Sequence, residues 1–222
     1  MISLKLYAYN AIKEKIIHCQ YPPNALLNEE IIKQDLHVSR TPIRDALGRL
    51  EQESIIKILP KRGILVTGIT SRDVNQIFET RLLIEPYMMN KYGKTISPGV
   101  YREFLDFFSI DTDAVYTDKD KVNQKDNDFH LLFITASNNP YLIQANEYPF
   151  FQDMRLRILS ASMGGDRIST SQKEHLAIAR WCCEKDWKNA AKALKEHLVF
   201  SRKRALDVVG SLKRTPILLS AV

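Results

Sequence analysis

The most informative stretch of this sequence is His37-Val38-Ser39-Arg40-Thr41-Pro42-Ile43-Arg44-Asp45-Ala46-Leu47. Ser39 or Thr41 can cap a helix with a side-chain oxygen, and Pro42 is tolerated in a first turn, where its missing N–H would have no partner. Apolar side chains then recur at helical spacing, which predicts one buried face. The residues of that face are Ile43, Ala46, Leu47 and Leu50.

Two more helices and a hairpin are predicted on either side of this helix from apolar spacing, caps and turn residues. The predicted elements are helices over residues 4–18 and 29–35, and strands over residues 55–59 and 64–67 joined by a turn at residues 60–63. Three helices and a two-stranded hairpin make a winged helix-turn-helix. We expect this domain over residues 1–69.

The exposed start of the third helix is a candidate DNA-reading surface, because a helix-turn-helix places that end in the major groove. Arginine gives the commonest specific base contact, two hydrogen bonds to guanine. We therefore expect Arg40 and Arg44 to read bases, and the hydroxyls of Ser39 and Thr41 to contact phosphates.

The tip of the hairpin can add a second DNA contact. Gly63 lets the backbone approach a groove closely, and Arg62 beside it can enter that groove. On residue types alone, these charged positions are equally compatible with an ordinary solvated face. Binding of these residues to double-stranded operator DNA is therefore a hypothesis at this point.

The rest of the chain has helical periodicity throughout. Breaks near residues 93–98, 111–113, 138–140 and 164–165 divide residues 70–209 into six or seven predicted helices. The fold class is thus mainly α, an N-terminal winged helix-turn-helix followed by an all-helical bundle. Residues 210–222 form a C-terminal tail to which no element is assigned.

Composition limits the class of protein. The chain has 222 residues, a net charge of +6 and 45% hydrophobic residues, values typical of a globular protein that can bind nucleic acid. No stretch is apolar enough for a membrane span, and the N-terminus lacks a secretory signal, so we expect a cytoplasmic protein without a membrane partner. The three cysteines are read as small hydrophobic residues.

Four side chains of the helical region form a candidate metal site. Asp126 and His130 are four residues apart and share one helix face, and His175 and His197 lie on apolar faces of later helices. Three imidazoles and a carboxylate from three helices suit a divalent ion of the zinc, nickel, manganese or iron type. The alternative, hydrogen-bonded core residues, explains the same pattern equally well.

The N-terminal third resembles the GntR family of bacterial regulators. The resemblance covers residues 4–67 and is carried by the run from His37 to Leu47 and by Pro60-Lys61-Arg62-Gly63-Ile64-Leu65-Val66. It implies DNA contacts at Ser39, Arg40, Thr41, Arg44 and Gly63. The chain departs from the family pattern at Asn24 and Ser54, where glycine is usual, and at Gly48, where a longer residue is common.

The remainder is similar to the ligand-binding domain of the FadR subfamily, called FCD, over about residues 71–205. The matching segments are Phe78 to Glu85, Asp126 to His130, Ala136 to Pro140, Glu174-His175 and Glu196 to Leu198. The resemblance implies a metal on Asp126, His130, His175 and His197. It also implies a small carboxylate effector that binds the metal's open positions.

Arg81 is the expected counter-charge for that effector, because its position in the opening helix of the FCD domain often faces the pocket. An intrahelical ion pair with Glu85, four residues later, is the alternative. The expected function is a ligand-responsive transcription regulator that binds a palindromic operator as a homodimer.

Two other functions would account for parts of this pattern. A metal-dependent hydrolase with an appended DNA-binding-like module would need a nucleophile or general base, and no recognisable motif supplies one. A non-specific nucleoid binder would leave the four-ligand set without a role.

Overall fold

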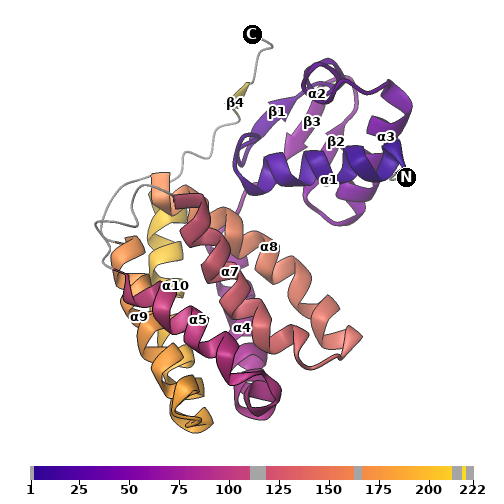
Figure 1. Ribbon diagram of the computed structural model, residues 1–222. Helices are drawn as coiled ribbons and strands as arrows, with labels where there is room; N and C mark the ends of the chain where they lie inside the picture. Colours follow the sequence, from indigo (N-terminus) through magenta and orange to yellow (C-terminus); the bar gives the residue numbers. More distant parts are fainter. Residues whose placement is uncertain (1–2, 111–118, 163–166, 212–216, 219–222) are drawn as a thin grey trace. The chain divides into compact units, whose positions relative to one another are not determined.

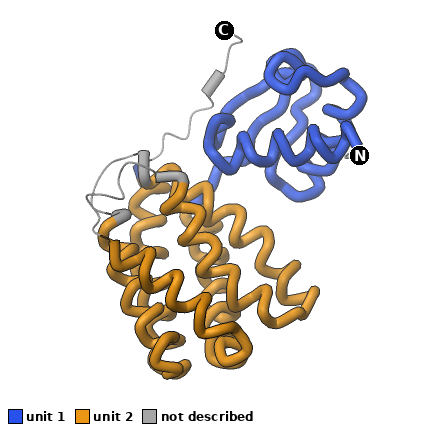
Figure 2. The backbone as a smooth tube through the Cα atoms, viewed as in Figure 1, with its two compact units in different colours: residues 1–70, 211–222 blue, residues 71–210 orange. Residues whose placement is uncertain are grey.

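The computed structural model describes residues 3–110, 119–162, 167–211 and 217–218. The chain divides into two compact units, Met1–Thr70 together with Ser211–Val222, and Ser71–Gly210 (Figures 1 and 2). We describe each unit by itself. The mainly helical fold class is confirmed.

The helices of the first unit are α1 (Leu4–Ile17), α2 (Glu29–Leu36) and α3 (Arg40–Gln52). They form close to where apolar spacing predicts them, and α1 packs against α3. Ala8, Ile12 and Ile16 of α1 are buried at helical spacing, as are Ile43 and Leu50 of α3. A helix-turn-helix core results, with the predicted inner face of α3 buried.

The sheet of this unit contains β1 (Ala25–Leu27), β2 (Ile56–Leu59), β3 (Gly63–Val66) and β4 (Ile217–Leu218), in the order β2-β3-β1-β4. The predicted hairpin is confirmed, with Ile56 opposite Val66. Two strands were not predicted. β1 pairs antiparallel with β3, and β4 pairs parallel with β1. Both are too short for an alternating pattern to reveal them.

Backbone conformation explains the unusual residues of this unit. Asn24 and Ser54, which stand where glycine is usual in the family, have φ values of 65° and 58°. Gly63 has a φ of 120°, and a Cβ there would lie 2.3 Å from the carbonyl oxygen of Leu27 in β1. Gly63 is therefore required by the sheet itself, in addition to any approach to DNA.

The described part of the second unit holds six α-helices and one 3-10 helix, in agreement with the six or seven predicted. They are α4 (Ser71–Tyr92), η1 (Gly93–Thr95), α5 (Pro98–Ser109), α7 (Lys119–Thr135), α8 (Pro140–Ser162), α9 (Arg167–Cys183) and α10 (Trp187–Ser211). The predicted breaks at residues 111–113 and 164–165 lie outside the described residues. No helix in the described ranges is both long enough and apolar enough to cross a membrane.

An aromatic cluster fills the core between α5, α7 and α9. Phe104 and Phe108 of α5 stack on each other and both contact the ring of Phe129 from α7. The ring of His175, from α9, lies 5.0 Å from that of Phe108. This packing fixes the helices that carry the polar residues of the bundle.

The starts of α2 and α3 give a matched test of helix capping. Asn28 accepts a hydrogen bond from the Ile31 amide at 2.8 Å, whereas Ser39 occupies the same position of α3 without a side-chain capping bond. We expect Asn28→Ala to cost about 1 kcal/mol of first-unit stability and Ser39→Ala to cost much less. Hydrogen exchange of α2 and α3 amides in the full chain measures both, and equal losses would contradict the assignment of caps.

Candidate metal centre and DNA-binding surface

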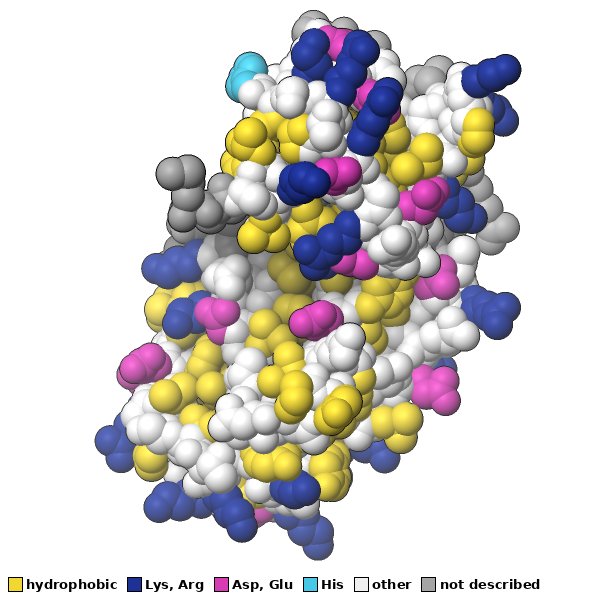
Figure 3. All heavy atoms as spheres, turned by 90° about the vertical axis from the view of Figure 1, so that its right-hand side faces the viewer, with side chains coloured by type: hydrophobic (Ala, Val, Ile, Leu, Met, Phe, Trp, Pro, Cys, Tyr) yellow, Lys and Arg dark blue, Asp and Glu magenta, His cyan; other side chains and the backbone are white. Residues whose placement is uncertain are grey.

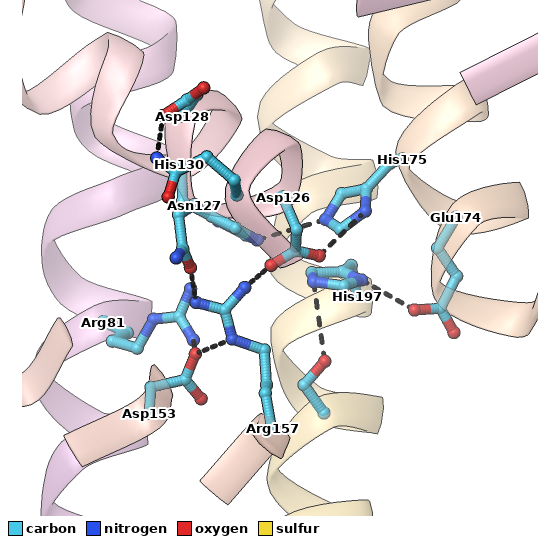
Figure 4. Close-up of polar contacts among 12 residues, drawn as sticks. Arg81, Asp126, Asn127, Asp128, His130, Asp153, Arg157, Glu174, His175 and His197 are labelled. Carbon is cyan, nitrogen blue, oxygen red and sulfur yellow. Dashed lines mark hydrogen bonds and ion pairs between the residues drawn. The ribbon is translucent and has the colours of Figure 1, made fainter. Parts of the chain in front are cut away.

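Three histidines from three helices meet inside the second unit (Figure 4). His130 lies on α7, His175 on α9 and His197 on α10, and all three are buried. One ring nitrogen of each lies within 4.8 Å of those of the other two. The structure thus brings together three of the four residues predicted as metal ligands.

Each of these rings contacts a carboxylate through Nδ1. His130 Nδ1 lies 2.7 Å from Glu85, and His197 Nδ1 lies 2.6 Å from Glu174. The Nδ1 of His175 is 3.2 Å from Asp126 Oδ1. An imidazole N–H that donates to a carboxylate leaves the Nε2 lone pair as the available donor atom.

The Nε2 atoms of His130 and His175 face each other, and the ring of His197 lies beside both. His130 Nε2 and His175 Nε2 are 3.1 Å apart, and the ring centroids of His175 and His197 are 4.4 Å apart. His197 Nε2 lies 3.5 Å from the hydroxyl of Ser201, one turn later on α10. Each imidazole thus has a carboxylate beside its Nδ1, and the Nε2 atoms of His130 and His175 lie next to each other.

Burial keeps two of these rings neutral. It lowers the pKa of His175 well below its usual value, and the nearby charges of His197, His130 and Arg157 lower it further. Burial also lowers the pKa of His197 to about 4, although the hydrogen bond to Glu174 opposes this shift. A neutral imidazole is the form that binds a metal.

The carboxylates behind the rings are ionised. Burial acts to raise the pKa of Glu85, but the charges of Arg81 and His130 outweigh it and bring the pKa to about 2. The pKa of Glu174 is also about 2, since hydrogen bonds from His197 and Arg204 outweigh its burial.

Asp126, the fourth predicted ligand, lies beside the three histidines and is directed elsewhere. Its Oδ2 forms an ion pair with Nη1 of Arg157 from α8, and its Oδ1 contacts His175 Nδ1. Arg157 also contacts Asn127 and lies 3.0 Å from Asp153. Asp126 is thus placed as the carboxylate partner of His175.

Arg81 is buried and paired on both sides. Its Nε lies 2.5 Å from Glu85, the intrahelical alternative considered from the sequence, and its Nη1 lies 2.6 Å from Asp153 of α8. Arg81, Glu85 and His130 therefore form a continuous chain of contacts to the histidine cluster.

Sequence reasoning did not identify Asp153 and Arg157, which complete this network. They are four residues apart on α8, a spacing that places both on one helix face. The available signal was two opposite charges at this spacing. Their partners on α4 and α7 depend on tertiary packing, which no local pattern shows.

The start of α3 presents the predicted DNA-contacting residues to solvent. The side chains of Arg40 and Arg44 are 64% and 65% exposed. Ser39 and Thr41 are exposed, and Arg62 is exposed in the turn between β2 and β3. Lys and Arg side chains are prominent on this unit, interleaved with carboxylates (Figure 3).

Sequence comparisons identify the class of protein. The profile of the bacterial regulatory proteins of the gntR family matches residues 4–66, and the FCD domain profile matches residues 76–200. The chain belongs to this family of transcription regulators, and it carries the FCD domain. It is therefore a regulator and not an enzyme, which removes the hydrolase alternative.

Curated relatives agree with this assignment. The chain is 27% identical over 201 residues to the regulator YdhC of Bacillus subtilis, which covers 87% of this chain and 85% of YdhC. It is 29% identical over 132 residues to the gluconate operon transcriptional repressor of the same organism, covering 59% of this chain. That match spans 54% of the gluconate repressor's length. The match to a regulator of Agrobacterium vitis spans 46% of that relative's length.

Solved structures share the fold. McbR/YncC of Escherichia coli has a TM-score of 0.78 at 18% identity, with 93% of this chain and 99% of that chain covered. The Zn²⁺-bound FCD domain of TM0439 has a TM-score of 0.50 at 22% identity and covers 63% of this chain and 96% of that one.

The buried histidines generate a pH prediction. Between pH 6.5 and pH 4 the unfolded chain binds a proton at position 197 that the folded chain does not, so stability falls as the pH is lowered through this window. We expect metal-free protein to lose about 1–2 kcal/mol of second-unit stability through His197 between pH 7.5 and pH 5.

Urea unfolding followed by tryptophan fluorescence measures this loss, because Trp181 and Trp187 both lie in the second unit. The His197→Gln variant should show a smaller loss over the same pH range. An unchanged pH dependence in that variant would show that His197 is not a source of the effect.

Proposed function

We propose that this regulator binds palindromic operator DNA as a homodimer and responds to a small carboxylate through a metal centre in its FCD domain. The observation that carries the proposal is the set of three buried imidazoles, each with Nδ1 on a carboxylate and Nε2 toward a common space. This is the arrangement in which outer carboxylates orient histidine ligands of a metal.

The donor set fits a divalent ion such as zinc. Two nitrogen ligands about 2.0–2.1 Å from one tetrahedral zinc ion are roughly 3.3 Å apart, close to the 3.1 Å between His130 Nε2 and His175 Nε2. The Zn²⁺-bound FCD domain of TM0439 supports the same assignment by fold. We propose His130, His175 and His197 as ligands, with Asp126 as the fourth once it leaves Arg157 and the Nδ1 of His175.

By expanding beyond four ligands, a bound ion would supply a coordination position for a carboxylate effector. Arg81 is proposed as the counter-charge, and Arg157 is a second guanidinium that shares Asp153 with it. Because each arginine is already paired, the effector would replace a protein carboxylate in its ion pair. This exchange connects effector binding to the packing of α4 against α8.

A second copy of the chain is proposed on the exposed apolar residues of the second unit. Leu83 and Tyr87, one turn apart on α4, are 72% and 54% exposed. Two copies would present two winged units to a palindromic site, as helix-turn-helix dimers do.

The metal prediction is tested on protein purified without chelator or metal-affinity tag. Elemental analysis and native mass spectrometry should find about one divalent ion per chain and two chains per particle. His197→Ala should remove or strongly weaken the metal, whereas His18→Ala, which changes an exposed histidine of the first unit, should not.

Chelation should lower the melting temperature of the second unit and leave the first nearly unchanged, since a metal that binds only the folded state stabilises it by mass action. A metal content near zero, unchanged after zinc, nickel or manganese is added, would leave the three histidines as core residues and remove the metal centre from the proposal.

The DNA prediction is tested with a duplex selected from a random library by the unmodified protein. Arg40→Ala and Arg44→Ala should each cost about 1–3 kcal/mol on this duplex and relax its sequence preference. Arg62→Ala should weaken binding with less change in preference. Arg102→Ala removes an exposed arginine from α5 and serves as the control. Undiminished binding by Arg44→Ala at fixed salt would show that α3 does not read the site.

A further inference from the structure

Arg44, which is predicted to read a base, forms an ion pair with a carboxylate of the neighbouring helix. Arg44 Nε of α3 lies 2.9 Å and 3.1 Å from the two carboxylate oxygens of Glu29. Glu29 is the first residue of α2, directly after Asn28, whose side chain caps that helix. The carboxylate therefore sits on a fixed helix start.

The contact with Glu29 uses Nε of Arg44 and leaves the two Nη groups of the guanidinium available. Within the described residues, Nε is the one nitrogen of Arg44 with a hydrogen bond. Arg44 and Glu29 also line a groove of about 440 Å³ with Leu47, Ile58, Lys61 and Gly63. The two Nη groups, which can bond guanine O6 and N7, are thus kept out of this ion pair.

Stability does not explain this pair. The side chains of Arg44 and Glu29 are 65% and 32% exposed, and ion pairs in solvent contribute little to folding. A carboxylate at a DNA-binding surface also repels phosphates, which weakens binding to any sequence. Glu29 thus has an electrostatic cost for DNA binding, and the stability that it contributes as a first-turn carboxylate of α2 is equally available from Glu30.

We propose that Glu29 is a positioning residue that sets operator specificity, because it orients Arg44 for a base and keeps it from pairing with phosphate. This inference rests on the proposed function, in which Arg44 reads a base. It gives Glu29 opposite effects on two kinds of DNA: it strengthens binding to the preferred site and weakens binding to all other sites.

Glu30 is a matched control in the same helix turn. Its carboxylate lies 3.0 Å from Lys33 and only 3.5 Å from Arg40, at the limit of hydrogen-bonding distance. Removing Glu30 changes the charge of the surface by the same amount as removing Glu29. It does not release Arg44.

The experiment compares full-length Glu29→Ala and Glu30→Ala on the selected duplex and on a scrambled duplex of equal composition. Glu29→Ala should lose roughly tenfold in affinity for the selected duplex, within the discrimination that a bidentate arginine–guanine contact provides. On the scrambled duplex it should gain about twofold, because one screened negative charge is removed. Glu30→Ala should gain on both duplexes.

The Arg44→Ala variant tests whether Glu29 affects DNA affinity through Arg44. There, Glu29→Ala should no longer weaken binding to the selected duplex, since the residue that it orients is gone. Equal changes on both duplexes for Glu29→Ala, in either direction, would overturn the positioning role alone, provided that Arg44→Ala weakens selected binding. If Arg44→Ala leaves selected binding unchanged, base reading by Arg44 fails and the positioning role fails with it.

Discussion

The second unit depends on one constraint: three imidazoles buried together must each have a partner for the nitrogen that points away from the others. An unpartnered buried polar group costs free energy comparable to a lost hydrogen bond or more. Glu85, Asp126 and Glu174 meet this requirement from α4, α7 and α9. Each of these carboxylates also pairs with an arginine, so the requirement extends to Arg81, Arg157 and Arg204.

The two proposed sites, the DNA-binding surface of the first unit and the buried site of the second, differ in how firmly their charges are fixed. Arg40 and Arg44 form ion pairs in solvent, where a pair contributes about 0–1 kcal/mol, so these contacts add little to folding. Arg81 and Glu85 are almost fully buried, and removing one partner of a buried pair costs about 3–5 kcal/mol. In the proposed function, effector binding therefore requires an exchange of partners inside the bundle, whereas base reading uses side chains that are already exposed.

Much of the fold and part of the site follow from local pattern. Helix α3 was predictable because its cap, its first-turn proline and its apolar stripe agree, and Asp126 and His130 were placed on one face by their spacing. Strands β1 and β4 were not predictable, since three and two residues are too few to show alternation. The direction of the Asp126 side chain was not predictable either, because it is set by Arg157, 31 positions later on another helix.

The same reasoning explains why the residues behind the predicted sites are the harder ones to find. A base-reading arginine or a ligand histidine has a residue type that points to its chemistry, and its helix face can be read from spacing. Glu29 and Glu174 are ordinary surface-type residues by sequence, and their roles come from the atoms they contact: Arg44 Nε in one unit and His197 Nδ1 in the other. In the roles proposed for Arg44 and His197, a carboxylate holds one nitrogen of the side chain and leaves the remaining nitrogens for the ligand. Orientation by a carboxylate is thus the physical device that the two units share, exposed in one and buried in the other.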